Sequence, residues 1–202
     1  MALTGLFGGT FDPPHVGHVG LARTAGERFG LDRLLVAPTG RTPGKRVATD
    51  PEIRLALAEA AFADVPCAEV SRLDVDRPQP AYSYETVRWA RERFGDILFL
   101  VGADRFVDFL TWERPNEVLR IARLAVATRP GFDRTQLDSV LAAVERPDQV
   151  EFFEIEPAPV SSTEIRRRVA AGQAIAGLVP PAVGRLIEEL GLYREPQVTP
   201  LH

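Results

Sequence analysis

The sequence has one cysteine, one lysine and no long apolar run. A single thiol, Cys67, excludes an internal disulfide and any zinc site built from several cysteines. No apolar stretch approaches the roughly 20 residues that a membrane-spanning helix needs. The segment Met1–Gly9 has neither the basic start nor the cleavage site of a secretory signal. We therefore expect a cytoplasmic protein with no membrane partner.

The charge balance argues against a broad basic surface, because 28 acidic residues outnumber 24 basic ones. The formal net charge is -4, so we expect no nucleic-acid partner, because nucleic-acid affinity comes largely from many cations that neutralise phosphates. Lys45 is the only lysine, so no other side chain supplies a compact, flexible ammonium group. An anionic ligand would therefore need a local cluster of positive charge or hydrogen-bond donors.

Length and composition are those of one globular domain, with 202 residues of which 45% are hydrophobic. We expect this domain to span residues 1–195 and to be followed by a frayed tail, 196–202. Four apolar runs without alternation predict buried strands: Leu3–Phe7, Leu34–Ala37, Ile97–Val101 and Leu124–Ala127. Helical spacing appears between them: Val19, Ala22 and Gly26; Ile53, Ala56, Leu57 and Ala60; Tyr84, Val87 and Phe94. The alternation predicts an α/β fold with a doubly wound parallel sheet.

Local signals mark the ends of several elements. Asp50 as a cap and Pro51 in the first turn predict the start of the second helix. Pro, Gly and polar residues predict loops at 38–48 and 74–82. A capping box, Ser161 to Glu164, predicts a helix over 161–171. Gly191 is expected to stop the last helix.

The first strand runs into a glycine turn and then a helix, the sequence Gly8-Gly9-Thr10-Phe11-Asp12-Pro13-Pro14-His15-Val16-Gly17-His18. Free backbone amides and the helix dipole favour an anion at such a turn, and glycine lets a phosphate approach closely. His15 and His18 are three residues apart, so a helix that starts near Pro14 presents both on one face. The alternative is a capped helix with one packed and one solvated histidine. The spacing of a P-loop is absent.

A second candidate anion site lies far along the chain. Ser161, Ser162 and Thr163 place three hydroxyls at a helix start, and Arg166 follows one turn later. The alternative is a well-capped helix with no ligand. Used together, the two sites would hold the two ends of a triphosphate.

The segments GGTFDPPHVGH and VSSTEIR resemble the paired signatures of the HxGH nucleotidyltransferases. Within that superfamily the chain is similar over nearly its whole length to the bacterial nicotinate-nucleotide adenylyltransferase family. Supporting segments follow in the same order: 38–45, 82–86, Gly102-Ala103-Asp104, Thr111-Trp112 and Arg129-Pro130-Gly131. The resemblance implies a Rossmann-like nucleotidyltransferase topology. It also implies an enzyme that joins ATP to nicotinate mononucleotide, with Mg²⁺ held by phosphates and water and no metal site of the protein's own.

The reaction implied by the resemblance is direct attack of the mononucleotide phosphate on the α-phosphorus of ATP. Such transfer depends on positioning and on neutralising phosphate charge. We expect that charge to be met by His15, His18, Lys45 and Arg166. The expected ATP-binding residues are Gly8, Gly9, Thr10, Phe11, His18, Gly102, Asp104, Ser161, Ser162, Thr163 and Arg166. The expected acceptor-binding residues are Lys45, Thr86, Trp112 and Arg129, with the pyridine ring stacked on Trp112.

The chain departs from the family pattern at two places near the acceptor. Gly44 precedes Lys45 where many relatives have histidine, and Pro115 replaces an aromatic residue that often follows the stacking tryptophan. Alternative acceptors are nicotinamide mononucleotide and phosphopantetheine, and a non-catalytic ATP-binding module is a further alternative. The sequence leaves the oligomeric state open, a homo-oligomer included.

Overall fold

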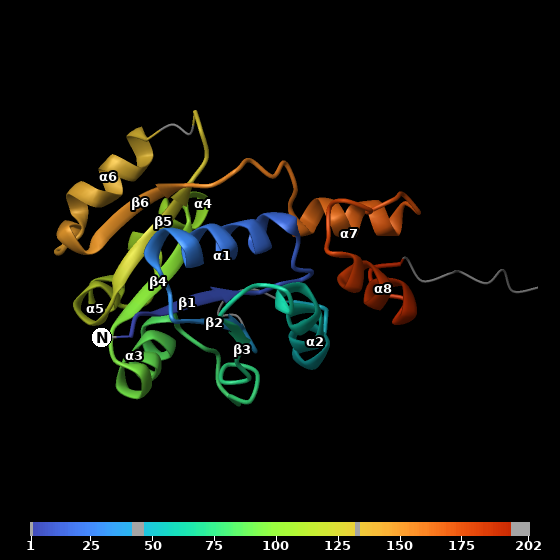
Figure 1. Cartoon of the computed structure of the whole chain (residues 1–202), viewed down its shortest axis with the longest axis horizontal. Coiled ribbons are helices and arrows are strands. Elements are labelled where there is room, and N and C mark those ends of the chain that lie inside the picture. The colour runs from blue at the N-terminus through green and yellow to red at the C-terminus, as the bar shows by residue number, and fades with distance from the viewer. Residues whose placement is uncertain (1, 42–46, 132–133, 195–202) are drawn as a thin grey trace, which may run out of the picture.

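The fold is a six-stranded parallel sheet with helices on both faces, seen in a computed structural model that describes residues 2–41, 47–131 and 134–194 (Figure 1). The strands are β1 (Thr4–Gly9), β2 (Arg33–Pro38), β3 (Ala68–Val70), β4 (Ile97–Gly102), β5 (Arg123–Thr128) and β6 (Val150–Glu154). Their order is β3-β2-β1-β4-β5-β6. The predicted fold class is confirmed. The four predicted strands are the central ones, and the two edge strands were missed.

Eight helices and two short 3-10 turns are found in the described residues. The helices are α1 (Val16–Phe29), α2 (Pro51–Phe62), α3 (Ser83–Phe94), α4 (Ala103–Phe106), α5 (Pro115–Ile121), α6 (Thr135–Ala143), α7 (Ser162–Ala170) and α8 (Pro181–Glu189). The 3-10 turns are η1 (Phe109–Thr111) and η2 (Pro147–Gln149). Within these described parts, no helix is long and apolar enough to cross a membrane.

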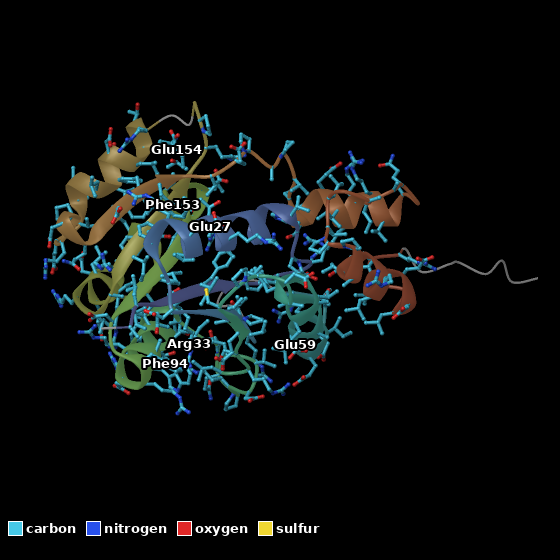
Figure 2. All side chains as sticks on the ribbon, viewed as in Figure 1. Glu27, Arg33, Glu59, Phe94, Phe153 and Glu154 are labelled. Atoms are coloured by element: carbon cyan, nitrogen blue, oxygen red, sulfur yellow. The ribbon has the colours of Figure 1, made fainter. Side chains whose placement is uncertain are left out.

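The helices form two layers, one on each face of the sheet. Successive strand residues point to opposite faces, so each face presents apolar side chains that a layer of helices covers. Phe7 belongs to the core cluster that includes residues of α1, α2, α7 and α8, whereas Leu6 belongs to the cluster that includes residues of α3, α4, α5 and α6. Phe153 of the edge strand β6, labelled in Figure 2, packs against Phe29 of α1 with ring centroids 5.3 Å apart. Burial on both faces explains why the central strands are continuous apolar runs.

Helix boundaries follow the predicted caps with one correction. The Asp50 carboxylate accepts a hydrogen bond from the N–H of Glu52, and α2 begins at Pro51 as expected. Ser161 caps α7 through the N–H of Glu164. The predicted capping box is incomplete, because the Glu164 carboxylate binds the guanidinium groups of Arg167 and Arg168 instead of turning back to the cap. Two nearby cations outcompete a neutral N–H for a carboxylate.

The α2 helix buries a face that differs from the predicted one. Leu57 is buried as expected, but Ile53, Ala56 and Ala60 are only partly buried. The helix instead buries Arg54, Leu55, Leu57, Ala58, Ala61 and Phe62. The prediction failed because the position at the centre of this face holds an arginine.

The strand order reverses direction between β1 and β4, which are neighbours although β2 and β3 separate them in the sequence. Ligands of open α/β sheets bind outside the carboxyl ends of strands at such a point. Here both strands end in glycine, Gly9 and Gly102. The α7 and α8 helices lie beside the beginning of α1, at this end of β1 (Figure 1). The predicted tail 196–202 and Lys45 fall outside the described residues.

Candidate active site

The two histidines of the glycine-turn motif are stacked on each other. The α1 helix begins at Val16, with His15 as its N-cap. The ring centroids of His15 and His18 are 3.7 Å apart and the planes differ by 27°. The two imidazoles therefore lie together, as predicted, and both residues are partly buried, unlike the alternative of one packed and one solvated histidine.

Gly17 makes this stacking possible. A β-carbon at position 17 would lie 3.1 Å from Nδ1 of His15 and 3.3 Å from the β-carbon of Ala158. Both approaches are too tight for an ordinary side chain without movement of its neighbours. The glycine between the histidines therefore admits the His15 ring on one side and the chain before α7 on the other.

Burial holds both histidines neutral. It lowers the pKa of His15 from 6.5 to about 4, and it lowers the pKa of His18 from 6.5 to about 3, with a smaller contribution from the charge of His15. Desolvation disfavours the charged imidazolium. The structure thus assigns charge states that the sequence left open.

The hydrogen bonding also fixes the tautomer of His18. Its Nδ1 accepts a hydrogen bond from the backbone N–H of His15 at 3.2 Å. In a neutral imidazole one nitrogen accepts and the other donates, so the proton of His18 sits on Nε2. His18 therefore offers one N–H donor to a ligand at neutral pH. The His18 ring is held by the edge of Phe11, with centroids 5.2 Å apart.

The glycines of the turn differ in what they permit. A β-carbon at Gly9 would lie 2.8 Å from the ring of Phe11, so Gly9 is required by the packing of its own loop. A β-carbon at Gly8 would make only ordinary contact, 3.8 Å from Phe99. The predicted opening of the backbone to a phosphate therefore fits Gly8 better than Gly9.

The second motif docks directly onto the first. The Ser162 hydroxyl donates a hydrogen bond to the carbonyl of Pro13 at 2.8 Å, across 149 residues of sequence. Arg166 donates to the carbonyl of Asp12 at 2.6 Å and to the hydroxyl of Thr163 at 3.2 Å. The two predicted anion sites therefore form one continuous surface, with Ser161 and Thr163 exposed.

A group missed from the sequence secures the same loop from the end of the chain. Tyr193 follows α8, and its hydroxyl donates to the Asp12 carboxylate at 2.7 Å. Asp12 is 8% exposed, and Arg166 approaches its carboxylate at 3.9 Å. Burial and the negative charge of Asp12 raise the pKa of Tyr193, so it stays protonated and remains a donor. Tyr193 carried no sequence signal, because its partner lies 181 residues away.

The residues expected near the ATP ribose and the nucleotide form an exposed ion pair. Arg129 follows β5, and its guanidinium lies 3.3 Å from the Asp104 carboxylate in α4. Gly102, rather than Asp104, is the N-cap of α4, so the alternative in which Asp104 caps the helix is wrong. A cavity of about 270 Å³ opens beside Arg129 and is lined also by Thr128, Gly131, Arg134, Phe152, Phe153 and Glu154.

The Trp112 indole stands at the end of η1 and is partly buried. Its ring packs at 6.2 Å from Phe99 and at 5.2 Å from Phe109, and the Arg105 guanidinium lies 6.0 Å from it. The buried Nε1 has no hydrogen-bond partner within the described ranges. Pro115, the departure from the family pattern, occupies the first turn of α5.

Thr86 is enclosed by its own surroundings. It is 5% exposed, and its hydroxyl lies 3.0 Å from both carboxylate oxygens of Asp74. Its backbone N–H donates to the carbonyl of Tyr82. Burial raises the pKa of Asp74 to about 6, although Thr86 and Arg77 act in the opposite direction. The predicted contact of this position with an acceptor carboxylate stays a prediction.

Another feature absent from the prediction is a buried arginine. Arg54 is 1% exposed and donates to the carbonyls of Thr10, Thr39, Gly40 and Thr49. These carbonyls belong to the loops after β1 and β2 and to the residue before the cap of α2. The sequence did carry a signal, because Arg54 lies three, four and seven residues before Leu57, Ala58 and Ala61 on a helical face.

Comparison with known proteins agrees with this arrangement. The profile of the cytidylyltransferase-like family matches residues 6–168. A probable nicotinate-nucleotide adenylyltransferase of Roseiflexus sp. (strain RS-1) is 39% identical, over 94% of this chain and 97% of that one. A counterpart from Thermus thermophilus is also 39% identical, over 94% and 98%. The solved structure of Plasmodium falciparum nicotinic acid mononucleotide adenylyltransferase complexed with NaAD shares the fold, with a TM-score of 0.77, 15% identity and coverage of 96% and 98%.

Proposed function

Because the chain belongs to the cytidylyltransferase-like family and to the nicotinate-nucleotide adenylyltransferases, we propose that it transfers the adenylyl group of ATP to nicotinate mononucleotide. The products are deamido-NAD and pyrophosphate, so the reaction serves NAD synthesis. The observation that carries the proposal is the union of the two motifs, in which Ser162 and Arg166 bind the loop that leads into the stacked His15 and His18.

The transfer needs no nucleophile from the protein. An oxygen of the acceptor phosphate forms a bond to the α-phosphorus of ATP, and the bond from that phosphorus to the bridging oxygen of pyrophosphate breaks. The acceptor phosphate is already anionic at pH 7, so a general base is not required. The protein acts by orienting both phosphates and by matching their charge.

We propose that hydrogen-bond donors around the glycine turn neutralise the charge of the phosphates. His18 donates through Nε2, because its Nδ1 is engaged by the His15 N–H. Arg166 is only partly buried, so its guanidinium can reach a phosphate while it remains on the Asp12 carbonyl. Lys45 stays a predicted contact and lies outside the described residues.

We include Mg²⁺ as the counter-ion that ATP brings with its phosphates, where it would reduce their charge repulsion. No group of three or more His, Cys, Asp or Glu residues that could hold a metal is found in the part of the chain that the structure describes. The proposal therefore assigns no protein ligand to the ion.

The surroundings of Trp112 support nicotinate mononucleotide as the acceptor. Trp112 offers a partly buried indole that packs near Phe99 of β4, and its wide aromatic face suits an electron-poor pyridine ring. The Arg105 guanidinium near this ring adds positive charge, which favours a carboxylate over an amide on the substrate. We further propose a cytoplasmic enzyme whose residues 1–195 form one domain.

The direct test is pyrophosphate release with ATP, Mg²⁺ and one acceptor at a time. Nicotinate mononucleotide should support turnover, and phosphopantetheine should not. Turnover with phosphopantetheine alone would move the function to a different acceptor. ATP binding without release for any acceptor would indicate a binding module.

A further inference from the structure

The buried guanidinium of Arg54 makes an uncommon set of contacts. Its Nη1 donates to the carbonyl of Thr10 at 2.9 Å and also to that of Thr39, its Nη2 donates to Gly40 at 2.7 Å, and its Nε donates to Thr49 at 3.2 Å. Every nitrogen therefore binds backbone rather than a side chain. One planar group thus ties together three separate stretches of the chain.

No carboxylate lies within ion-pair distance of Arg54 in the described residues. Burial lowers the pKa of Arg54, and the negative charges of Asp12 and Asp50 offset this only in part. A buried cation without a paired anion is expensive compared with an apolar side chain of similar volume. Stability alone therefore does not account for an arginine at this position.

The contacts determine which way two peptide groups face. The peptides after Thr10 and after Thr39 are trans, so in each the N–H points opposite to the carbonyl. Because Arg54 draws both carbonyls toward itself, the N–H groups of Phe11 and Gly40 are directed away from the guanidinium. Neither N–H donates a hydrogen bond to any other described residue.

These two amides belong to the loops that follow β1 and β2, which pair with each other in the sheet. The loop after β1 carries the glycine turn and leads to the stacked histidines. Gly40 also has no room for a side chain, because a β-carbon there would lie 2.0 Å from the carbonyl oxygen of Asp74. The first residues of each loop, Thr10 in one and Thr39 and Gly40 in the other, are thus held from the inside.

We infer that Arg54 is a positioning residue for the transfer: by holding the carbonyls of Thr10, Thr39 and Gly40, it orients the amides of these loops toward the phosphates of the substrates. The inference rests on the proposed function for the identity of those phosphates. Arg54 touches no substrate itself. It acts through peptide groups whose other side faces the ligand.

The test compares Arg54→Met and Arg54→Lys with Leu57→Ala, a control from the same helix. Leu57 is fully buried but has no polar group that could hold a carbonyl, so removal of its side chain leaves a cavity in the core without releasing a peptide group. All variants are assayed as the full chain with ATP, Mg²⁺ and nicotinate mononucleotide, well below their melting temperatures. The split between kcat and KM for ATP is measured for each.

Arg54→Met should lower kcat/KM for ATP by roughly 10-fold or more, because the amides lose their fixed direction, whereas Leu57→Ala should stay within about 2-fold of the wild type. Arg54→Lys should fall between them, since one ammonium cannot span the carbonyls that a guanidinium spans. Equal kcat/KM for Arg54→Met and Leu57→Ala would overturn the inference. If Arg54→Met does not fold, equality of Arg54→Lys with the wild type would overturn it.

Calorimetry with α,β-methylene-ATP separates this inference from the proposed function. A wild type that binds the analogue but releases no pyrophosphate from ATP in the turnover assay would contradict the proposed function. In that case Arg54→Met should still bind the analogue about 10-fold more weakly than Leu57→Ala does. Equal dissociation constants for the two variants would overturn the role of Arg54 whatever the reaction proves to be.

Discussion

Replacement of His18 should weaken catalysis and, at the same time, improve stability in acid. The folded protein holds the pKa of His18 at about 3, compared with 6.5 for an unrestrained histidine. A histidine whose pKa is lowered on folding leaves stability intact above pH 6.5, and that stability is lost as the pH falls toward the folded pKa. His18→Ala removes this penalty together with the Nε2 donor.

The size of the effect follows from the linkage between protonation and folding. Between pH 8 and pH 5 the unfolded histidine becomes almost fully protonated, whereas the folded one stays neutral, so the wild type should lose about 2 kcal/mol from this group. His18→Ala should lose none of it. The change in unfolding free energy caused by the mutation should therefore be about 2 kcal/mol more favourable at pH 5 than at pH 8.

The assay is urea unfolding at both pH values, with turnover measured at pH 7.5. Glu27→Gln serves as the control, because Glu27 lies exposed on the same helix (Figure 2). Turnover of His18→Ala should fall by more than about 10-fold, which corresponds to about 1.4 kcal/mol of transition-state stabilisation. An identical stability change at both pH values would refute the buried, neutral state of His18, and unchanged turnover would refute its role as a donor.

Three further predictions concern the acceptor side and the joint between the motifs. Trp112→Ala should raise the KM for nicotinate mononucleotide far more than the KM for ATP, while Trp89→Ala, which removes the chain's other tryptophan, should change neither; equal effects of Trp112→Ala on both substrates would indicate a structural role. Asp74 has a raised pKa, so the stability it contributes is present below its unfolded pKa of 3.8 and is lost as the pH rises through about 6, by up to about 3 kcal/mol. Asp74→Asn should flatten that loss in denaturant titrations between pH 4 and pH 8, and a slope like that of the wild type would contradict the assignment. Ser162→Ala should lower the free energy of unfolding by about 1 kcal/mol and weaken ATP binding, because the Pro13 carbonyl loses its donor. Calorimetry that finds the ATP affinity unchanged would show that this contact between the two motifs does not shape the ATP site.

The central part of the fold was predictable because its signals are local. Buried strands such as Ile97–Gly102 are uninterrupted apolar runs, and α2 starts where Asp50 and Pro51 indicate. The edge strand β3 has only three residues and was missed, because so short a segment carries no readable pattern. The edge strand β6, Val-Glu-Phe-Phe-Glu, was missed because its two exposed glutamates interrupt the apolar run and its adjacent phenylalanines break any strict alternation.

The parts of the candidate site that form contiguous motifs were predictable from the sequence. The histidine pair and the serine-rich helix start were found because each is contiguous in sequence. Contacts between distant segments were not, as Tyr193 and Asp12 illustrate. The charge of His18 depends on burial, which becomes visible only once the fold is formed.

The choice of acceptor is the sharpest test of the proposed function. Pyrophosphate release is measured with ATP and Mg²⁺, and nicotinate mononucleotide is compared with nicotinamide mononucleotide at matched concentrations. The proposed function predicts a strong preference for the acceptor that carries the carboxylate. A preference for the amide, or no release with either acceptor, would contradict it.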